Sequence, residues 1–371
     1  MSCTFNCQLK RRLIISNDIP VPEGFSGREK RPAQIIGMLH VPSNSMLTAQ
    51  PAWMETLNLP KLNSNDFKII INLQKDFHEI IKHVEIPSFK DEFSGGIALS
   101  GNIDSLEDDL SRLSFINYLR DRVLNEIKIY VRNGVTILQF ENIGAPYFIR
   151  QSVPVEDQLI LNYLVKAARQ EYPRLPMGIQ VLAFADNIAL EIAVRHKLFY
   201  IRGESFLFQG CRPEGLTGNK GNLAKAYYMR QFFNLSLGRE NIFPKIYPDL
   251  LKKHTIFDEE LNDLNKWLGN IAFQKLEGVV LTGEQTGSPI NKTDLKIAKK
   301  VLDELNEKYP ELPGAKMPLI SGSGANPDNI SWYKKNVDYI ITGSFHKIGG
   351  YWENRIDEER LKVFLEHYHA T

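Results

Sequence analysis

Two short glycine-containing turns near the C-terminus have the composition of a phosphate-binding site. Residues 320–324 read Ile-Ser-Gly-Ser-Gly, residues 341–344 read Ile-Thr-Gly-Ser, and each turn closes an apolar run. Glycine lets the backbone approach an anion closely, so that consecutive N–H groups converge on phosphate oxygens. Lys347 follows the second turn and adds a positive charge. The predicted phosphate-binding residues are Gly322, Ser323, Gly324, Gly343, Ser344 and Lys347.

Carboxylates and a histidine follow other apolar runs of the chain. Glu141, Glu204 and Asp249 each come shortly after an apolar, β-branched run, and His254 completes the polar cluster that Asp249 begins. Side chains of these types transfer protons, and carboxylates also bind divalent cations. We predict catalytic roles for Glu141, Glu204, Asp249 and His254.

Each of these residues also has a structural interpretation. Arg202 and Glu204 lie on the same side of a strand, because side chains repeat every second residue, so the two can pair with each other. The pair Lys252 and Lys253 is of a kind common on solvated surfaces, and His40 suits the core as well as a ligand contact. The other predicted ligand contacts are His40, Asn142, Arg202, Lys252, Thr282 and Thr286.

The elements that position these residues alternate regularly. Apolar runs typical of buried parallel strands are followed by amphipathic patterns typical of helices. The predicted strands are residues 34–41, 135–140, 177–182, 198–202, 241–247, 278–281, 318–321 and 339–342. The predicted helices include a helix from about residue 114 and residues 155–171, 187–196, 223–233, 261–276, 292–309 and 357–369.

Eight strand-helix units predict an α/β fold, a (β/α)₈ TIM barrel over residues 31–371. In this fold the carboxyl ends of the strands meet at one mouth, and the loops after strands seven and eight often bind phosphate. An open doubly wound sheet is the alternative, but the early glycine-rich nucleotide loop that it usually carries is missing from the sequence.

Two segments fall outside the repeating pattern. Residues 1–30 are expected to be a flexible tail, and Lys10, Arg11 and Arg12 with no acid before Asp18 give it a weak similarity to an organellar presequence. Residues 44–113 form a long insertion after the first strand, which we expect to be a lid, a surface decoration or a disordered segment. An insertion at this point opens on the catalytic face of a barrel.

Composition narrows the class of protein. The chain has 371 residues, with 45 Lys and Arg against 44 Asp and Glu, so it has no global field that favours nucleic acid, and any anion site is local. Three cysteines in no paired pattern indicate a reducing compartment, and no apolar run is long enough to cross a bilayer. We expect a soluble cytoplasmic protein, with a mitochondrial location as the alternative.

Motifs at the strand ends occur in an order that resembles the BtpA family (BtpA/SgcQ). They are Gly-Met-Leu-His at 37–40, Glu-Asn at 141–142, Ile-Arg-Gly-Glu at 201–204, the cluster at 249–254, Thr-Gly at 282–283 and 286–287, Gly-Ser-Gly at 322–324, and residues 342–347 with 349–352. The resemblance covers nearly all of the chain except the tail and the insertion.

The sequence also departs from the family pattern. A Leu-Pro-Gly turn is usual after the first strand, where this chain has Val-Pro-Ser-Asn-Ser at 41–45, and of the Arg-Asn-Asp usual near the third strand only Asp186 is retained. Residues 211–215, Cys-Arg-Pro-Glu-Gly, resemble an animal-type branch.

The resemblance implies a TIM barrel with a phospho-ligand pocket and leaves the reaction open. One hypothesis is an enzyme, a hydrolase or a lyase/isomerase, acting on a sugar phosphate or nucleotide derivative. The other is a non-enzymatic assembly or stability factor that uses the barrel as a scaffold and presents residues 67–71 of the insertion to a partner. Use of a divalent cation and formation of a homo-oligomer are left open.

Overall fold

Eight parallel strands form a closed ring in the computed structural model. The structure describes residues 20, 33–42, 68–69, 72, 104–143, 153–204, 211–212, 215–216, 223–236, 242–250, 253–254, 264, 277–308 and 317–370. The strands are β1 (Gln34–Pro42), β2 (Ile137–Ile143), β3 (Met177–Gln180), β4 (Tyr200–Gly203), β7 (Lys245–Pro248), β8 (Val279–Leu281), β9 (Leu319–Ser321) and β10 (Tyr339–Thr342).

The ring runs in the order β7-β4-β3-β2-β1-β10-β9-β8, with every neighbouring pair parallel. A parallel bridge between Asp249 and Val280 closes it, and the amide N of Leu250 donates to the carbonyl O of Val280 over 2.7 Å. The predicted TIM barrel is therefore confirmed, with all eight strand positions overlapping the observed ones.

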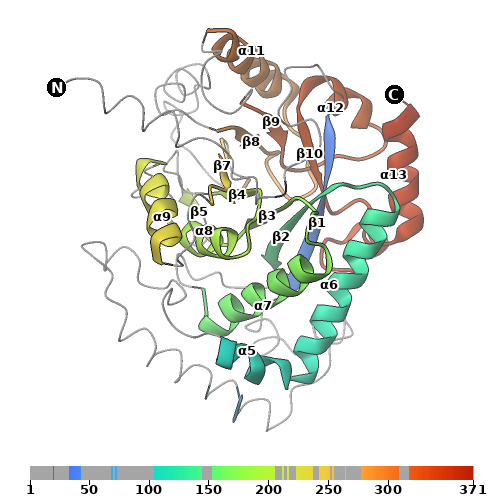
Figure 1. The fold of residues 1–371 in the computed structure, drawn as a ribbon. Helices are drawn as coiled ribbons and strands as arrows, with labels where there is room; N and C mark the ends of the chain where they lie inside the picture. The colour runs from blue at the N-terminus through green and yellow to red at the C-terminus, as the bar shows by residue number, and fades with distance from the viewer. Residues whose placement is uncertain are drawn as a thin grey trace, which may run out of the picture.

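Helices cover the outside of the ring (Figure 1). They are α5 (Asp104–Ser111), α6 (Ser114–Arg132), α7 (Val155–Glu171), α8 (Asp186–Arg195), α9 (Leu223–Ser236), α11 (Lys292–Lys308), α12 (Ile330–Asn336) and α13 (Glu358–Ala370). A short antiparallel ribbon joins β5 (Cys211–Arg212) to β6 (Gly215–Leu216), and the 3-10 turn η3 spans Ile348–Gly350. The helix predicted at residues 261–276 lies outside the described residues, apart from Leu264.

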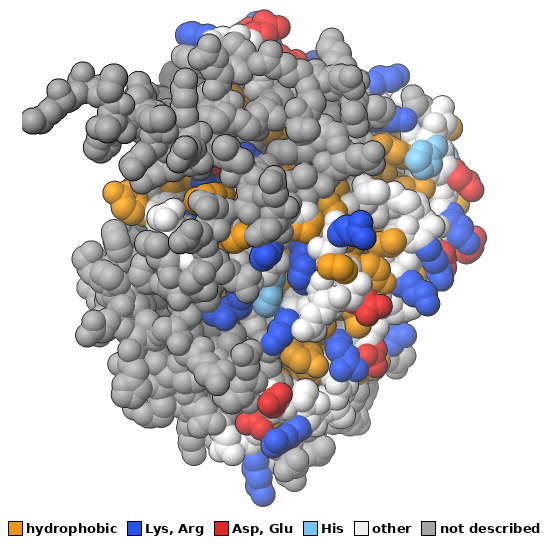
Figure 2. All heavy atoms as spheres, in the orientation of Figure 1, with side chains coloured by type: hydrophobic (Ala, Val, Ile, Leu, Met, Phe, Trp, Pro, Cys, Tyr) orange, Lys and Arg blue, Asp and Glu red, His pale blue; other side chains and the backbone are white. Residues whose placement is uncertain are grey.

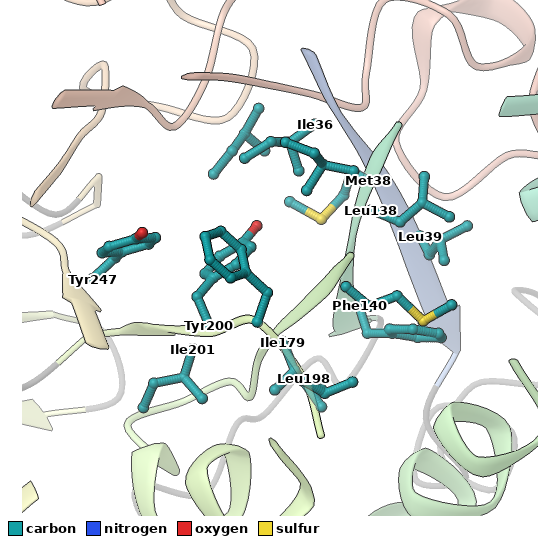
Figure 3. Close-up of a cluster of buried hydrophobic side chains, with 14 of the residues drawn as sticks. Ile36, Met38, Leu39, Leu138, Phe140, Ile179, Leu198, Tyr200, Ile201 and Tyr247 are labelled. Carbon is teal, nitrogen blue, oxygen red and sulfur yellow. The ribbon is translucent and has the colours of Figure 1, made fainter. Parts of the chain in front are cut away.

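The strands are buried on both faces, which explains their continuous apolar sequences. Inside the ring, Tyr200 packs against Tyr247 with ring centroids 5.2 Å apart (Figure 3). The Tyr200 hydroxyl donates to Oε1 of Gln139. Gly178 allows this packing, because a Cβ there would lie 2.2 Å from the Tyr200 ring. A filled interior leaves the strand ends as the place for a site.

The end of the predicted insertion belongs to the body of the protein. Helix α5 contacts both α6 and α7, and Leu110 and Leu113 are buried in the hydrophobic core. Residues 67–71, apart from 68 and 69, and most of the rest of the insertion lie outside the described residues, so its role as a lid or partner surface stays a prediction.

The described surface carries mixed charge. In Figure 2, Lys and Arg side chains gather near the middle of the view, and Asp and Glu side chains lie mainly toward its lower and right edges. Within the described ranges, no helix combines the length and hydropathy needed to cross a membrane.

Candidate functional site

A cavity of about 520 Å³ opens at the carboxyl ends of the strands. The first two strands, β4 and the loops after β3, β7, β8, β9 and β10 all contribute to its wall. Its polar lining residues include His40, Glu141, Arg202, Lys253, His254, Thr286, Ser323, Asn326, Thr342, Ser344 and Arg360. Side chains from distant parts of the sequence are thus brought to one mouth, as the barrel prediction requires.

Both glycine turns lie in the cavity wall and offer unused N–H groups. Among the described residues, no acceptor engages the amides of Gly324, Ala325, Gly343 or Ser344. The amide of Gly322, by contrast, donates to the carbonyl O of Leu281 over 2.8 Å and is part of the sheet. The amides of Gly324, Ala325, Gly343 and Ser344 therefore form the phosphate cradle that the structure can offer. This cradle lies nearer the rim of the cavity than the predicted site, which included Gly322.

Close packing fixes the path of the turn after β9. Gly324 has a φ of +74°, and a Cβ there would lie 2.3 Å from the carbonyl O of Ser288. Ser323 ties the turn to the loop after β8, since its hydroxyl accepts from the amide of Gly283 over 2.9 Å and donates to the same Ser288 oxygen over 3.0 Å. The Ser323 side chain thus holds the turn in place.

The cation at the second turn is Arg360, which the sequence analysis missed. It lies in the first turn of α13, where Asp357 caps the helix by accepting from the amides of Glu359 and Arg360. Its Nε donates to the carbonyl O of Phe345 over 2.7 Å, and its guanidinium lies 4.6 Å from the centre of the Phe345 ring. Arg360 therefore borders the cavity beside the amides of the second turn.

Lys347, the cation predicted for this role, lies elsewhere. Its side chain is fully buried, outside the cavity lining, and Nζ pairs with Oε2 of Glu126 on α6 over 2.7 Å. Burial lowers the pKa of Lys347 more than the charge of Glu126 raises it, so the pKa lies below its ordinary value. The ion pair fastens the loop after β10 to α6.

Arg202 and Asp249 pair at the base of the cavity. Nε of Arg202 donates to Oδ1 of Asp249 over 2.9 Å, Nη2 lies 3.4 Å from Oδ2, and neither side chain is exposed. Burial lowers the pKa of Arg202, but Asp249 and Glu141 outweigh burial and raise it overall. Arg202 lines the cavity, whereas Asp249 lies behind it, where it orients the guanidinium.

Glu141 faces the cavity and has no partner among the described residues. The residue is 6% exposed, and no donor among the described residues reaches its carboxylate. Its register partner on β1 is His40, so the two side chains lie on the same face of neighbouring strands. A carboxylate that borders the cavity can accept a proton or a hydrogen bond from a ligand.

Glu204 and Asn142 hold the loop after β3. Glu204 accepts from Nε2 of Gln180 over 3.0 Å and from the amide of Phe184 over 2.9 Å. Asn142 donates to the carbonyl O of Leu182 and accepts from its amide. Neither lines the cavity, so the geometry favours a positioning role for both residues over the predicted direct roles.

His40 is a neutral imidazole in the cavity wall. Burial lowers its pKa well below 6.5, and the positive charges of Lys347 and Lys253 lower it further. Its ring packs edge-on against Trp352 with centroids 6.0 Å apart, and Nδ1 is buried with no hydrogen-bond partner in the described ranges. The ring can therefore donate or accept one hydrogen bond with a ligand.

The remaining predicted contacts belong to the loops after β7 and β8. Nε2 of His254 lies 3.2 Å from Oγ1 of Thr286, and both residues line the cavity. Thr282 accepts from the amide of Lys253 over 2.9 Å, which fixes one loop against the other. Lys252 lies outside the described residues, and Lys253 is the lysine seen in the wall.

A metal site is not evident in the described part of the chain. No group of three or more His, Cys, Asp or Glu side chains there is arranged to hold a metal ion. Glu141, Glu204 and Asp249 thus do not converge as a ligand set, and the divalent cation stays an untested prediction.

Comparison with known proteins places this barrel in a family. The BtpA family model matches residues 109–370, which is most of the chain. The chain belongs to the BtpA family. An uncharacterised mitochondrial protein of Caenorhabditis elegans is 30% identical over 255 residues, covering 66% of this chain and 83% of that protein. The photosystem I biogenesis protein BtpA of Synechocystis is 25% identical over 246 residues, covering 66% and 78%.

Solved barrels resemble this BtpA-family chain more distantly. Thiamine phosphate pyrophosphorylase from Pyrococcus furiosus has 11% identity and a TM-score of 0.39, covering 67% of this chain and 89% of that one. The 7,8-dihydropteroate synthase from Vibrio fischeri has 12% identity and a TM-score of 0.40, covering 93% and 96%. Scores this low carry no conclusion about chemistry.

Proposed function

We propose that this BtpA-family protein is an enzyme that binds a phosphorylated small molecule at the mouth of its barrel. The observation that carries the proposal is the convergence of two glycine turns with unengaged amides and the Arg360 guanidinium on one cavity. Amides and a guanidinium are the donors that phosphate oxygens accept from most strongly.

The charges of the cavity wall favour an anion. In the described lining, the cations Arg202, Lys253 and Arg360 accompany a single carboxylate, Glu141. Because the whole chain is nearly neutral, this excess is local to the mouth. A positive, concave wall raises the local concentration of anionic ligands.

Glu141 is the strongest candidate for proton transfer. It reaches the cavity, it has no internal donor in the described structure, and neutral His40 lies beside it in register. A general base needs a carboxylate within hydrogen-bond reach of the ligand, which this position supplies. Hydrolase and lyase or isomerase chemistry both use such a group.

Thermal-shift screening of the full-length protein tests this proposal. The panel contains sugar phosphates, nucleoside monophosphates, the matching unphosphorylated compounds and divalent cations. Saturable stabilisation is expected from phosphorylated compounds, and it should be lost with their unphosphorylated partners. Equal responses within these pairs would contradict a phosphate site.

A second candidate function is support of the assembly of a protein complex. The name of the Synechocystis relative, a photosystem I biogenesis protein, favours it. The test is Arg360→Met in cells that lack the native protein. Restoration of function by a variant that no longer binds phosphate compounds would favour the assembly role.

We also propose a mitochondrial location as the alternative to the cytoplasm. The nematode relative is named as a mitochondrial protein, and the acid-free basic stretch around Lys10, Arg11 and Arg12 fits a presequence. Fractionation of cells expressing the full chain, with a variant in which these three residues are Ala, distinguishes the two compartments.

A further inference from the structure

Three buried polar groups near the base of the cavity have no hydrogen-bond partner in the described part of the chain. Nη1 of Arg202 and Nδ1 of His40 lack hydrogen-bond partners, and the carboxylate of Glu141 receives no donor from the described residues. Buried polar groups left unpaired are costly and rare, so such groups commonly meet a ligand or water. All three residues line the cavity.

The base lies deeper than the phosphate cradle. A Cβ on Gly322 would lie 3.1 Å from Nη2 of Arg202, which places this guanidinium beside the buried start of the β9 turn. The unengaged amide of Gly324 is two residues farther toward the rim. A ligand held by phosphate at the rim therefore extends its other end toward Arg202 and Glu141.

The charges at the base disfavour a second anion. Asp249 already compensates the charge of Arg202 through both of its oxygens, whereas Glu141 forms no ion pair with any described residue. Glu204 lies close enough to act on the charge of Arg202 as well. The formal charges of Arg202, Asp249, Glu141 and Glu204 thus sum to a negative value, although one donor of Arg202, Nη1, remains unused.

We infer that the base of the cavity is a second binding site, for an uncharged group that carries a hydrogen-bond acceptor next to a hydrogen-bond donor. Arg202 donates to the acceptor, Glu141 accepts from the donor, and a carboxylate in the same place is repelled by Glu141. The inference rests on the proposed phosphate site for the position of the ligand's other end.

Two kinds of phosphorylated compound have this chemistry. A sugar phosphate presents a carbonyl beside a hydroxyl, and a nucleotide with a lactam base presents a carbonyl beside a ring N–H. The apolar part of the wall accommodates either, since Met38, Ile143, Leu182, Ile341 and Trp352 also line the cavity.

Calorimetric titration of the unmodified protein tests the inference through matched ligands. Dihydroxyacetone phosphate is compared with 3-phosphoglycerate, and uridine 5′-monophosphate with its N3-methyl derivative. The first compound of at least one pair should bind about tenfold or more tightly, because like charges a few ångströms apart or an unpaired buried group cost at least that much. The pair that discriminates identifies the source of the ligand.

The variant Glu141→Gln removes the negative charge at nearly constant shape. If the wild-type protein discriminates within the first pair, the variant should reduce its preference for dihydroxyacetone phosphate over 3-phosphoglycerate by about tenfold. If it discriminates within the second pair, the variant should reduce its preference for uridine 5′-monophosphate over the N3-methyl derivative by about tenfold. As the control, Arg360→Met should weaken both members of a pair equally.

The possible failures are distinct. Equal affinities within both pairs, tighter binding of 3-phosphoglycerate, or an unchanged preference in Glu141→Gln would overturn the second site while phosphate binding stands. Absence of binding by all four compounds and by inorganic phosphate would overturn both the second site and the proposed function.

Discussion

Arg202 and Asp249 form an ion pair in which neither side chain reaches solvent, with Nε of Arg202 2.9 Å from Oδ1 of Asp249. Asp249 also makes the bridge to Val280 that closes the ring of strands. Closure of the barrel and orientation of the guanidinium in the cavity wall therefore depend on the same residue.

Breaking this pair should destabilise the protein strongly. Asp249→Asn leaves a buried guanidinium without its counter-charge, for which we expect a loss of about 3 kcal/mol or more in the free energy of unfolding. Urea denaturation followed by circular dichroism measures it. As a control, Lys362→Ala removes an ion pair with Glu359 on the exposed face of α13 and should leave stability unchanged within error. Equal midpoints for the two variants would refute the structural role.

Arg360 and Lys347 should separate ligand binding from stability. Arg360→Met removes a cation from the cavity wall and should weaken binding of phosphate compounds about tenfold or more, with Arg360→Lys keeping part of the affinity. Lys347→Met leaves Glu126 buried without its 2.7 Å partner, so it should lower the free energy of unfolding instead. Titration calorimetry and urea denaturation of each variant measure the two effects, and a stronger ligand defect in Lys347→Met would contradict this assignment.

The buried histidines should make stability depend on pH. Burial lowers the pKa of His346 to about 3, with smaller contributions from Lys347 and Arg360. Below the ordinary value of 6.5 the unfolded chain therefore binds a proton that the folded chain does not, so stability falls as pH falls from 6.5 toward 3. The slope approaches about 1.4 kcal/mol per pH unit for one such group.

The variant His346→Gln isolates this contribution. His40 shifts in the same direction and remains in both proteins, so the difference in slope between wild type and variant reports His346 alone. Free energies of unfolding at several pH values between 5 and 7 supply the comparison. Parallel pH profiles would show instead that the pKa of His346 is the same in the folded and unfolded protein.

Two glycines with positive φ provide a matched test of the first turn. Gly324 and Gly287 have φ of +74° and +83°, but a Cβ would lie 2.3 Å from Ser288 O at Gly324 and meet nothing within 4 Å at Gly287. Gly287→Ala should cost about 1 kcal/mol of backbone strain, while Gly324→Ala should cost more and also displace the turn. Phosphate affinity should fall in Gly324→Ala and persist in Gly287→Ala, and the opposite order would exclude the turn from the site.

The barrel was predictable because its strands are continuous apolar runs separated by helical patterns. Burial on both faces requires apolar residues along each strand, and this requirement does not depend on the length or sequence of the loops. Strand ends were therefore located to within three residues, and His40, Glu141 and Arg202 were identified as residues that reach the mouth.

The orientation of individual polar groups was not predictable in the same way. Glu204 is held by Gln180 and by the amide of Phe184, which lies in the irregular loop after β3. Lys347 is held by Glu126, which is far from it in the sequence. Arg360 was missed because it lies in a helix rather than at a strand end. Its position in the first turn of the last helix, just after a capping Asp357, is the signal that identifies it.

Amide NMR of the protein during titration with inorganic phosphate tests the central claim most directly. The signals of Gly324, Gly343 and Ser344 should shift saturably, because their N–H groups are unengaged in the described structure, while Gly322, bonded to Leu281, should shift little. Arg360→Met should weaken the response. Saturable shifts confined to other residues, or no shift at these three amides, would contradict a phosphate site at the mouth of the barrel.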